Sequence, residues 1–333
     1  MTVVQLADVR HRFGDVPALR GLNIEAEPGS ITVLVGPNGA GKTTAIRAIT
    51  GALAVEHGEV RVFGLDPAVE GERVRRRCGV VSAKPALYDR LTGRDNLLYS
   101  AELYGLGRHA DVREAAALFG IVDALDQQVG GYSTGMKTRL ALARSVVHQP
   151  DLLLLDEPTS GLDPESSVAV LSMIRSMAEG GRTVIMCTHL LLEAEGLADR
   201  IIVLEGGADV VTGTPSDLTS RYWPGVVVRL DAEDPAMLDR LRGGEGVLTY
   251  QRDASCATVQ LDDPARVPDL VASLAAAGVR LTRVEPHTPT LEDLYFAVRG
   301  LKREEQTALG GVGAPASARS RGWGPGGEKG TAA

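Results

Sequence analysis

Short apolar runs separated by turn residues open the chain and predict a series of strands. The runs at the front cover residues 3–6, 22–26, 31–35 and 59–62. Later runs cover residues 152–155, 183–187 and 201–204 and alternate with stretches of helical character such as 190–198. The run 152–155 is entirely apolar, which is typical of a strand covered on both faces. This alternation predicts an α/β fold with a largely parallel sheet.

The middle of the chain, residues 91–145, has few β-type runs and is predicted to be helical. A boundary is predicted near Tyr222-Trp223-Pro224-Gly225. Beyond it, the pattern predicts a strand, a helix, two strands, a helix and a strand, which is a ferredoxin-like βαββαβ order. These elements cover 226–230, 235–241, 247–250, 257–261, 267–277 and 279–284.

A final helix is predicted at 291–298, and after Lys302 the chain is rich in Gly, Ala and Ser, which predicts a disordered tail. The predicted domains are therefore 1–222, a small α+β domain at 223–300, and a tail at 301–333. A length of 333 residues allows two domains that each bury a core.

The segment that follows the apolar run 31–35 fits the phosphate-binding loop pattern GxxxxGK[ST]. The predicted phosphate-binding residues are Gly36, Pro37, Asn38, Gly39, Ala40, Gly41, Lys42, Thr43 and Thr44. Glycines let successive backbone N–H groups turn inward towards an anion. Lys42 adds a positive charge for the β and γ phosphates, the Thr43 hydroxyl can ligate Mg²⁺, and the helix that begins near Lys42 presents its positive end. We expect a nucleoside triphosphate site here.

Two acidic residues end the apolar run 152–155, where open α/β sheets place ligand-binding groups. Asp156 can hold Mg²⁺ through water, and Glu157 can polarise the attacking water. Two acids at a strand end are common by themselves, so their meaning depends on the phosphate-binding loop.

Together these motifs resemble the nucleotide-binding subunit of ATP-binding cassette (ABC) transporters, over residues 3 to about 218. Tyr132-Ser133-Thr134-Gly135-Met136 falls where the family's signature loop belongs, Ser160-Gly161-Leu162-Asp163 matches the D-loop, and His189 matches the switch histidine. Phe13 matches the aromatic that stacks on adenine, although it could equally be a core residue. The resemblance implies a P-loop NTPase cassette with a mixed sheet core and a helical subdomain.

The resemblance also implies ATP and Mg²⁺ as cofactors and two partners. In the family, two copies close head to tail over two ATP molecules, so that Ser133 and Gly135 of one copy would face Lys42 of the other. An integral-membrane permease on a separate chain completes the transporter and would hold this subunit at the cytoplasmic side of the membrane. Residues 88–104 are where the permease's coupling helix would dock.

The sequence departs from the family pattern at two places. Ala83 takes the position of the Q-loop glutamine, and alanine can neither ligate Mg²⁺ nor orient water, so we expect lowered activity. Ser82 or an extra water is a candidate substitute. In the signature loop, Thr134 and Met136 replace a glycine and a glutamine, while Ser133 and Gly135 are kept.

These departures and the ending Pro289-Thr290-Leu291-Glu292-Asp293-Leu294-Tyr295 are similar to bacterial drug-resistance and sodium-extrusion subunits. The leading prediction is therefore an ATPase that powers export of a drug-like or lipid-like molecule. The alternatives are an ABC ATPase that works without a permease, or a regulatory ATP-binding module with weakened catalysis.

Bulk properties narrow these alternatives. The net charge of −8 disfavours nucleic acid as a partner, and the cluster Arg75-Arg76-Arg77 fits a solvated helix face better than a nucleic-acid patch. The three cysteines form neither a disulfide framework nor a metal pair, which fits a reducing compartment. No secretory signal is visible, and no apolar run approaches the ~18 residues of a membrane span.

Overall fold

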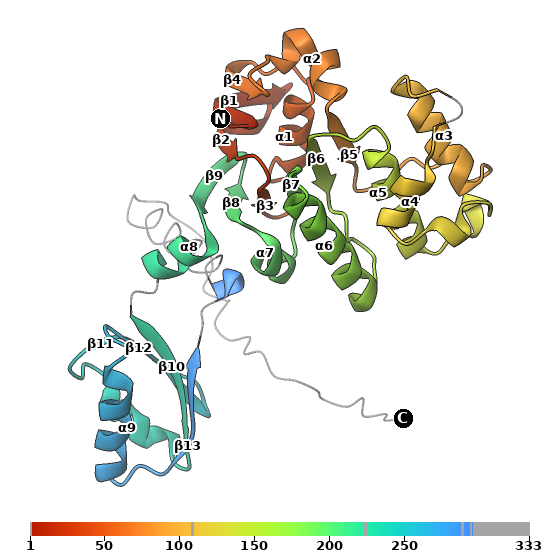
Figure 1. Ribbon diagram of the computed structural model, residues 1–333. Helices are drawn as coiled ribbons and strands as arrows, with labels where there is room; N and C mark the ends of the chain where they lie inside the picture. The colour runs from red at the N-terminus through yellow and green to blue at the C-terminus, as the bar shows by residue number, and fades with distance from the viewer. Residues whose placement is uncertain (1, 108–109, 223–224, 288–289, 294, 296–333) are drawn as a thin grey trace, which may run out of the picture.

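The computed structural model describes residues 2–107, 110–222, 225–287, 290–293 and 295. Figure 1 shows a larger α/β unit, coloured red to green, followed along the chain by a smaller α+β unit in teal and blue. The α/β fold class and the small α+β unit agree with the sequence-based prediction. The predicted domain limits remain predictions, and the predicted tail at 301–333 lies outside the described residues.

A six-stranded sheet in the order β5-β6-β7-β3-β8-β9 forms the centre of the larger unit. Its strands are β3 (Ile31–Val35), β5 (Cys78–Val81), β6 (Leu152–Asp156), β7 (Thr183–Thr188), β8 (Arg200–Glu205) and β9 (Ala208–Gly213). All neighbouring pairs are parallel except β8 and β9, which makes the sheet mixed. The strands predicted at 31–35, 152–155, 183–187 and 201–204 are confirmed, whereas β5 and β9 were not predicted.

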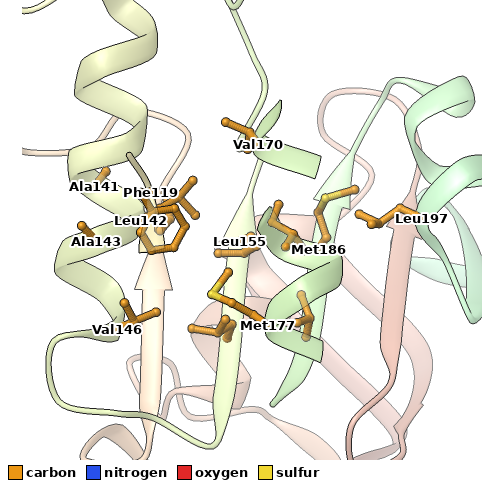
Figure 2. Packing of buried hydrophobic residues seen from close by; sticks show 14 of the residues in the cluster. Phe119, Ala141, Leu142, Ala143, Val146, Leu155, Val170, Met177, Met186 and Leu197 are labelled. Atoms are coloured by element: carbon orange, nitrogen blue, oxygen red, sulfur yellow. The ribbon is translucent and has the colours of Figure 1, made fainter. Parts of the chain in front are cut away.

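Both faces of this sheet are covered. Leu152 and Leu154 of β6 belong to the apolar cluster that the sheet shares with a second, antiparallel sheet. Leu153 and Leu155 belong instead to the cluster built with the helices, in which Figure 2 labels Leu155. All four leucines are fully buried, as an uninterrupted apolar run predicts for a strand between two layers.

The second sheet has the antiparallel order β2-β1-β4. Its strands are β1 (Val4–Phe13), β2 (Val16–Ala26) and β4 (His57–Val62). β1 and β2 are longer than the predicted runs at 3–6 and 22–26. The outer half of β1 alternates exposed and buried positions and so has few consecutive apolar residues, while the outer half of β2 contains Pro17, which weakens a strand signal.

The helices of the larger unit lie around the two sheets and in a lobe beside β5 (Figure 1). Those around the sheets are α1 (Lys42–Ile49), α2 (Pro67–Arg75), α6 (Pro164–Glu179), α7 (Leu191–Leu197) and α8 (Pro215–Tyr222). The lobe contains α3 (Gly93–Leu103), α4 (Arg113–Leu118), the 3-10 turns η1 (Val122–Ala124) and η2 (Val129–Gly131), and α5 (Thr134–Val146). The helical character predicted for 91–145 is therefore confirmed.

Phe119 anchors this helical lobe. Its side chain is fully buried and belongs to the same apolar cluster as Leu142 of α5, both of which are labelled in Figure 2. The N-terminus of α5 carries Ser133 as its cap, because the Ser133 hydroxyl accepts the Met136 N–H at 3.2 Å. Packing behind α5 therefore fixes where the predicted signature loop lies.

The smaller unit contains β10 (Val226–Ala232), η3 (Pro235–Leu241), β11 (Val247–Arg252), β12 (Cys256–Leu261), α9 (Arg266–Ala276) and β13 (Leu281–His287). Its strands form one antiparallel sheet in the order β11-β12-β10-β13. This is the order that the predicted βαββαβ pattern produces, with the first helix a 3-10 helix rather than an α-helix.

After the smaller unit, the chain returns to the larger one. Leu291 is 6 % exposed and belongs to the apolar cluster of the larger unit. Its N–H donates to the Glu195 carboxylate of α7 at 3.3 Å. Of the helix predicted at 291–298, residues 291–293 and 295 are helical, and the rest lies outside the described residues.

Candidate functional site

The predicted phosphate-binding loop connects β3 to α1 at the carboxyl edge of the central sheet. Gly39 and Gly41 have φ of 81° and 106°, a region that side chains with a Cβ rarely adopt. Gly36 has a different reason to be glycine: a Cβ there would lie 2.4 Å from the carbonyl oxygen of Leu204. The loop is thus packed tightly against the end of β8.

Lys42 is the first residue of α1 and is 6 % exposed. Its ammonium donates to the Gly36 carbonyl at 2.6 Å, which folds the side chain back over the loop. No acidic residue lies in the first turn of α1, so the positive end of that helix is not neutralised from within the helix. The loop therefore combines an ammonium group and a helix N-terminus around one cavity.

Thr43 and Asp156 meet on the side of the loop that faces β6. The Thr43 hydroxyl donates to Asp156 Oδ2 at 2.7 Å, and Asp156 is 6 % exposed. A hydroxyl and a carboxylate in contact are hard oxygen donors of the kind that Mg²⁺ prefers. Among the described residues, no group of three or more His, Cys, Asp or Glu side chains could hold a metal by itself.

Glu157 and His189 meet because β6 and β7 are neighbours and both residues follow the ends of these strands. His189 Nδ1 lies 2.7 Å from Glu157 Oε2. The other carboxylate oxygen, Oε1, lies 3.2 Å from Lys42 Nζ. The Lys42 contact lacks hydrogen-bond geometry, so Oε1 is a buried oxygen that accepts no hydrogen bond. Glu157 also has a φ of 53°, a strained value for a residue other than glycine.

A cavity of about 240 Å³ lies over these groups. The phosphate-binding loop residues 37–44, Asp156 and Glu157 line it, together with Ala83 and Ala18 of β2. Sequence reasoning did not find Ala18, since a small apolar residue in a strand carries no chemical signal. The cavity thus joins the loop, the acidic pair and the predicted Q-loop position.

Six predicted site residues do not line this cavity. Gly36 and His189 contact lining residues, Lys42 and Glu157 respectively, and the other four lie elsewhere. Phe13 ends β1 with its side chain 48 % exposed, and its ring packs edge-on against His11 with centroids 4.8 Å apart. Ser133 and Gly135 begin α5, and Asp163 caps α6 by accepting the Ser166 N–H at 2.9 Å. Ser133 and Asp163 are exposed to solvent. Within one copy, these groups are separate from the loop.

The comparisons with known proteins agree with this geometry. The sequence pattern of ABC transporters matches residues 19–160. The daunorubicin/doxorubicin resistance ATP-binding protein DrrA of Streptomyces peucetius is 36 % identical over 303 residues, covering 89 % of this chain and 92 % of DrrA. This chain belongs to the ABC transporter family.

Two further comparisons place the chain within the family. The Nod factor export ATP-binding protein I of Rhizobium etli is 32 % identical, covering 92 % of this chain and 96 % of that protein. A solved structure of an ATP-binding subunit of an ABC transporter superposes with a TM-score of 0.60 at 26 % identity, covering 66 % of this chain and 93 % of that one. The chain is an ATP-binding subunit of this family and an ATPase.

The predicted Q-loop position, Ala83, allows a test of the effect of the missing glutamine. Ala83 lines the cavity, and the Ser82 hydroxyl donates to the Lys84 carbonyl at 3.0 Å instead of facing Asp156 and Glu157.

Replacing Ala83 with glutamine should therefore raise ATP turnover by roughly tenfold, because an added hydrogen bond to a charged reacting group is worth about 1.5–3 kcal/mol. Steady-state phosphate release across a magnesium titration measures this. Ala83→Leu is the control, since it adds bulk without a polar atom. Unchanged turnover and magnesium dependence in Ala83→Gln would refute the interpretation.

Proposed function

We propose that this protein hydrolyses ATP, with Mg²⁺, to power export of a drug-like or lipid-like molecule through a permease encoded on another chain. The observation that carries the proposal is that Glu157, which lines the cavity together with Lys42, contacts both Lys42 and His189. The similarity to a Nod factor export protein supports export as the direction of transport, and the similarity to a daunorubicin/doxorubicin resistance protein supports a drug-like cargo.

In this proposal, Glu157 polarises the attacking water. Its Oε1 is buried and accepts no hydrogen bond, so it is available to accept a proton from water, while the contact at 2.7 Å with His189 fixes the other oxygen. Lys42 and the loop N–H groups bind the phosphates, and His189 contacts the γ-phosphate. Before substrate binds, the Lys42 ammonium pairs with the Glu157 carboxylate. Binding of the triphosphate would draw the ammonium to the phosphates, so that the carboxylate could interact with the attacking water.

The Thr43–Asp156 pair fits Mg²⁺ in this proposal. Their two oxygen atoms would hold the ion, and water and phosphate oxygens would supply its other ligands. Bound there, Mg²⁺ would supply charge neutralisation at the phosphates. Thr43 and Asp156 hold the site together by their own hydrogen bond, which would be exchanged for metal contacts.

A second copy of the chain would complete the site. Ser133, Gly135 and Asp163 do not line the cavity of their own copy, and Ser133 lies exposed at the N-terminus of α5, where anions bind favourably. A head-to-tail pair would bring this terminus to the γ-phosphate held by the partner's loop. Phe13, exposed at the end of β1, would stack on the adenine.

The permease would dock on the exposed apolar face of the helical lobe. Tyr88 and Tyr99 pack edge-on with centroids 5.2 Å apart, and both are more than 40 % exposed. Leu103, at the end of α3, is 71 % exposed. None of the helices in the described part of the chain is long and apolar enough to span a bilayer.

The proposal is tested by measuring ATP hydrolysis by the purified chain with Mg²⁺, with EDTA, and after co-expression with the six-span protein encoded nearest its gene. We expect Mg²⁺-dependent turnover that changes in the presence of that membrane protein. A turnover rate that does not change in the presence of the membrane protein would favour an ABC ATPase without a permease. ATP binding without turnover would favour a regulatory module.

A further inference from the structure

A second carboxylate lies beside the Glu157–His189 pair and takes no part in the chemistry above. Glu193 lies in the first turn of α7, shortly after His189, and is half-buried. Thr159 follows Glu157 closely and is 3 % exposed. The Thr159 hydroxyl donates to Glu193 Oε2 at 2.5 Å. This hydrogen bond joins the turn that carries Glu157 to the helix that follows His189.

The turn at Glu157 needs such an anchor. The φ of 53° at Glu157 costs free energy and persists only where the surrounding contacts fix it. Two backbone hydrogen bonds do part of this: the Glu157 N–H donates to the Cys187 carbonyl at 2.9 Å, and the Ser160 N–H donates to the Glu157 carbonyl at 3.1 Å. The Thr159 hydroxyl is the side-chain anchor of the same turn.

Glu193, which accepts the Thr159 hydrogen bond, is also held in place relative to His189. The Leu190 N–H donates to the Thr188 hydroxyl at 3.0 Å, which sets the chain direction between β7 and α7. Ala194 and Leu197 hold α7 in the apolar core, where Ala194 is fully buried. Glu193 is therefore carried by an element whose position also determines that of His189.

The electrostatics agree with this closeness. The pKa of Glu193 is raised above its ordinary value, mainly by burial. The hydrogen bond from Thr159 lowers this pKa, the charge of Glu157 raises it, and His189 lowers it. Glu193 is thus within electrostatic reach of both members of the pair. A half-buried carboxylate beside another carboxylate is costly unless its hydrogen bond is kept.

We propose that Glu193 is a positioning residue for ATP hydrolysis: by accepting the Thr159 hydroxyl, it holds Glu157 and His189 in register. The inference rests on the proposed function, since it assumes that Glu157 polarises the water. It assigns Glu193 and Thr159 no contact with substrate. It also joins the D-loop, which begins directly after Thr159, to the switch histidine, so that the two move together.

The test compares Thr159→Val, which removes the hydroxyl at nearly constant shape, with Glu193→Ala and the double variant. Each single change should lower kcat by roughly tenfold, as expected for a hydrogen bond to a charged group, and the double variant should fall no further. The ATP dissociation constant should stay within about twofold of the wild-type value, because neither residue touches the loop. Thr159→Ser and Glu193→Gln should restore most of the rate, since each keeps a donor or acceptor in place.

Leu192→Ala is the matched control, because Leu192 is the neighbouring α7 residue and is 72 % exposed. Thermal unfolding of every variant shows whether a lower kcat comes from lost positioning or from lost folding. Rates of Thr159→Val and Glu193→Ala equal to wild type would overturn the inference while leaving the proposed function intact. So would additive losses in the double variant, or a Glu193→Gln rate as low as that of Glu193→Ala. Absence of turnover in the wild-type protein would refute the proposed function itself.

Discussion

Replacing Glu157 with glutamine should slow ATP turnover by roughly 10²–10⁴-fold while ATP still binds. The amide keeps the size of the side chain but removes the charge on Oε1, the oxygen that accepts no hydrogen bond in the structure. Its other terminal atom can still contact His189, so the site should keep its shape. Single-turnover phosphate release and equilibrium ATP binding measure the two effects separately.

The same variant should accumulate as an ATP-bound dimer, because closure no longer leads to hydrolysis. Size-exclusion chromatography with and without ATP would show this. Glu72→Gln is the control, since Glu72 is an exposed α2 residue that pairs with Arg76 on the same surface helix. A Glu157→Gln protein that turns over ATP at nearly the wild-type rate would exclude Glu157 as the residue that polarises water.

Removing Lys42 should destabilise the nucleotide-free protein by about 3 kcal/mol, at the lower end of the range for breaking a buried ion pair. The side chains of Lys42 and Glu157 are 6 % and 12 % exposed, with Nζ and Oε1 3.2 Å apart. Lys42→Ala leaves Glu157 buried without its cation, although His189 still contacts the other oxygen. Urea unfolding of the nucleotide-free protein measures the loss.

Adding Glu157→Gln to Lys42→Ala should recover most of that stability, because the buried charge is then gone. Lys137→Ala is the matched control: its ammonium pairs with Asp89 at 3.0 Å, but the two side chains are 34 % and 63 % exposed. An exposed pair of this kind contributes about 0–1 kcal/mol. If Lys42→Ala loses no more stability than Lys137→Ala, Lys42 and Glu157 do not stabilise each other in the nucleotide-free protein.

The site residues that could be predicted from the sequence follow the ends of strands. Lys42, Asp156 and His189 each follow a short apolar run, and parallel strands bring their carboxyl ends to one edge of the sheet. The cavity with its acidic pair therefore follows from local patterns plus one rule of sheet geometry. Its polar residues could be predicted from the sequence, whereas Ala18 of β2 could not.

What could not be predicted depends on contacts between distant segments. Thr159 and Glu193 are 34 positions apart, and neither residue belongs to a pattern that signals the other. β5 is four residues long and contains Gly79, so its sequence carries a weak strand signal. A Cβ on Gly79 would meet the Ser145 carbonyl at 2.2 Å, a constraint visible only once α5 lies against β5.

The return of the chain at Leu291 means that the smaller unit is attached to the ATPase at two places. Leu218 of α8, 2 % exposed, anchors the outgoing chain, and Leu291 anchors the incoming one in the same core. Cutting the chain after β13 would remove Leu291 and expose the apolar residues of the ATPase that it covers. A shortened protein should therefore aggregate at concentrations where the intact protein stays in solution.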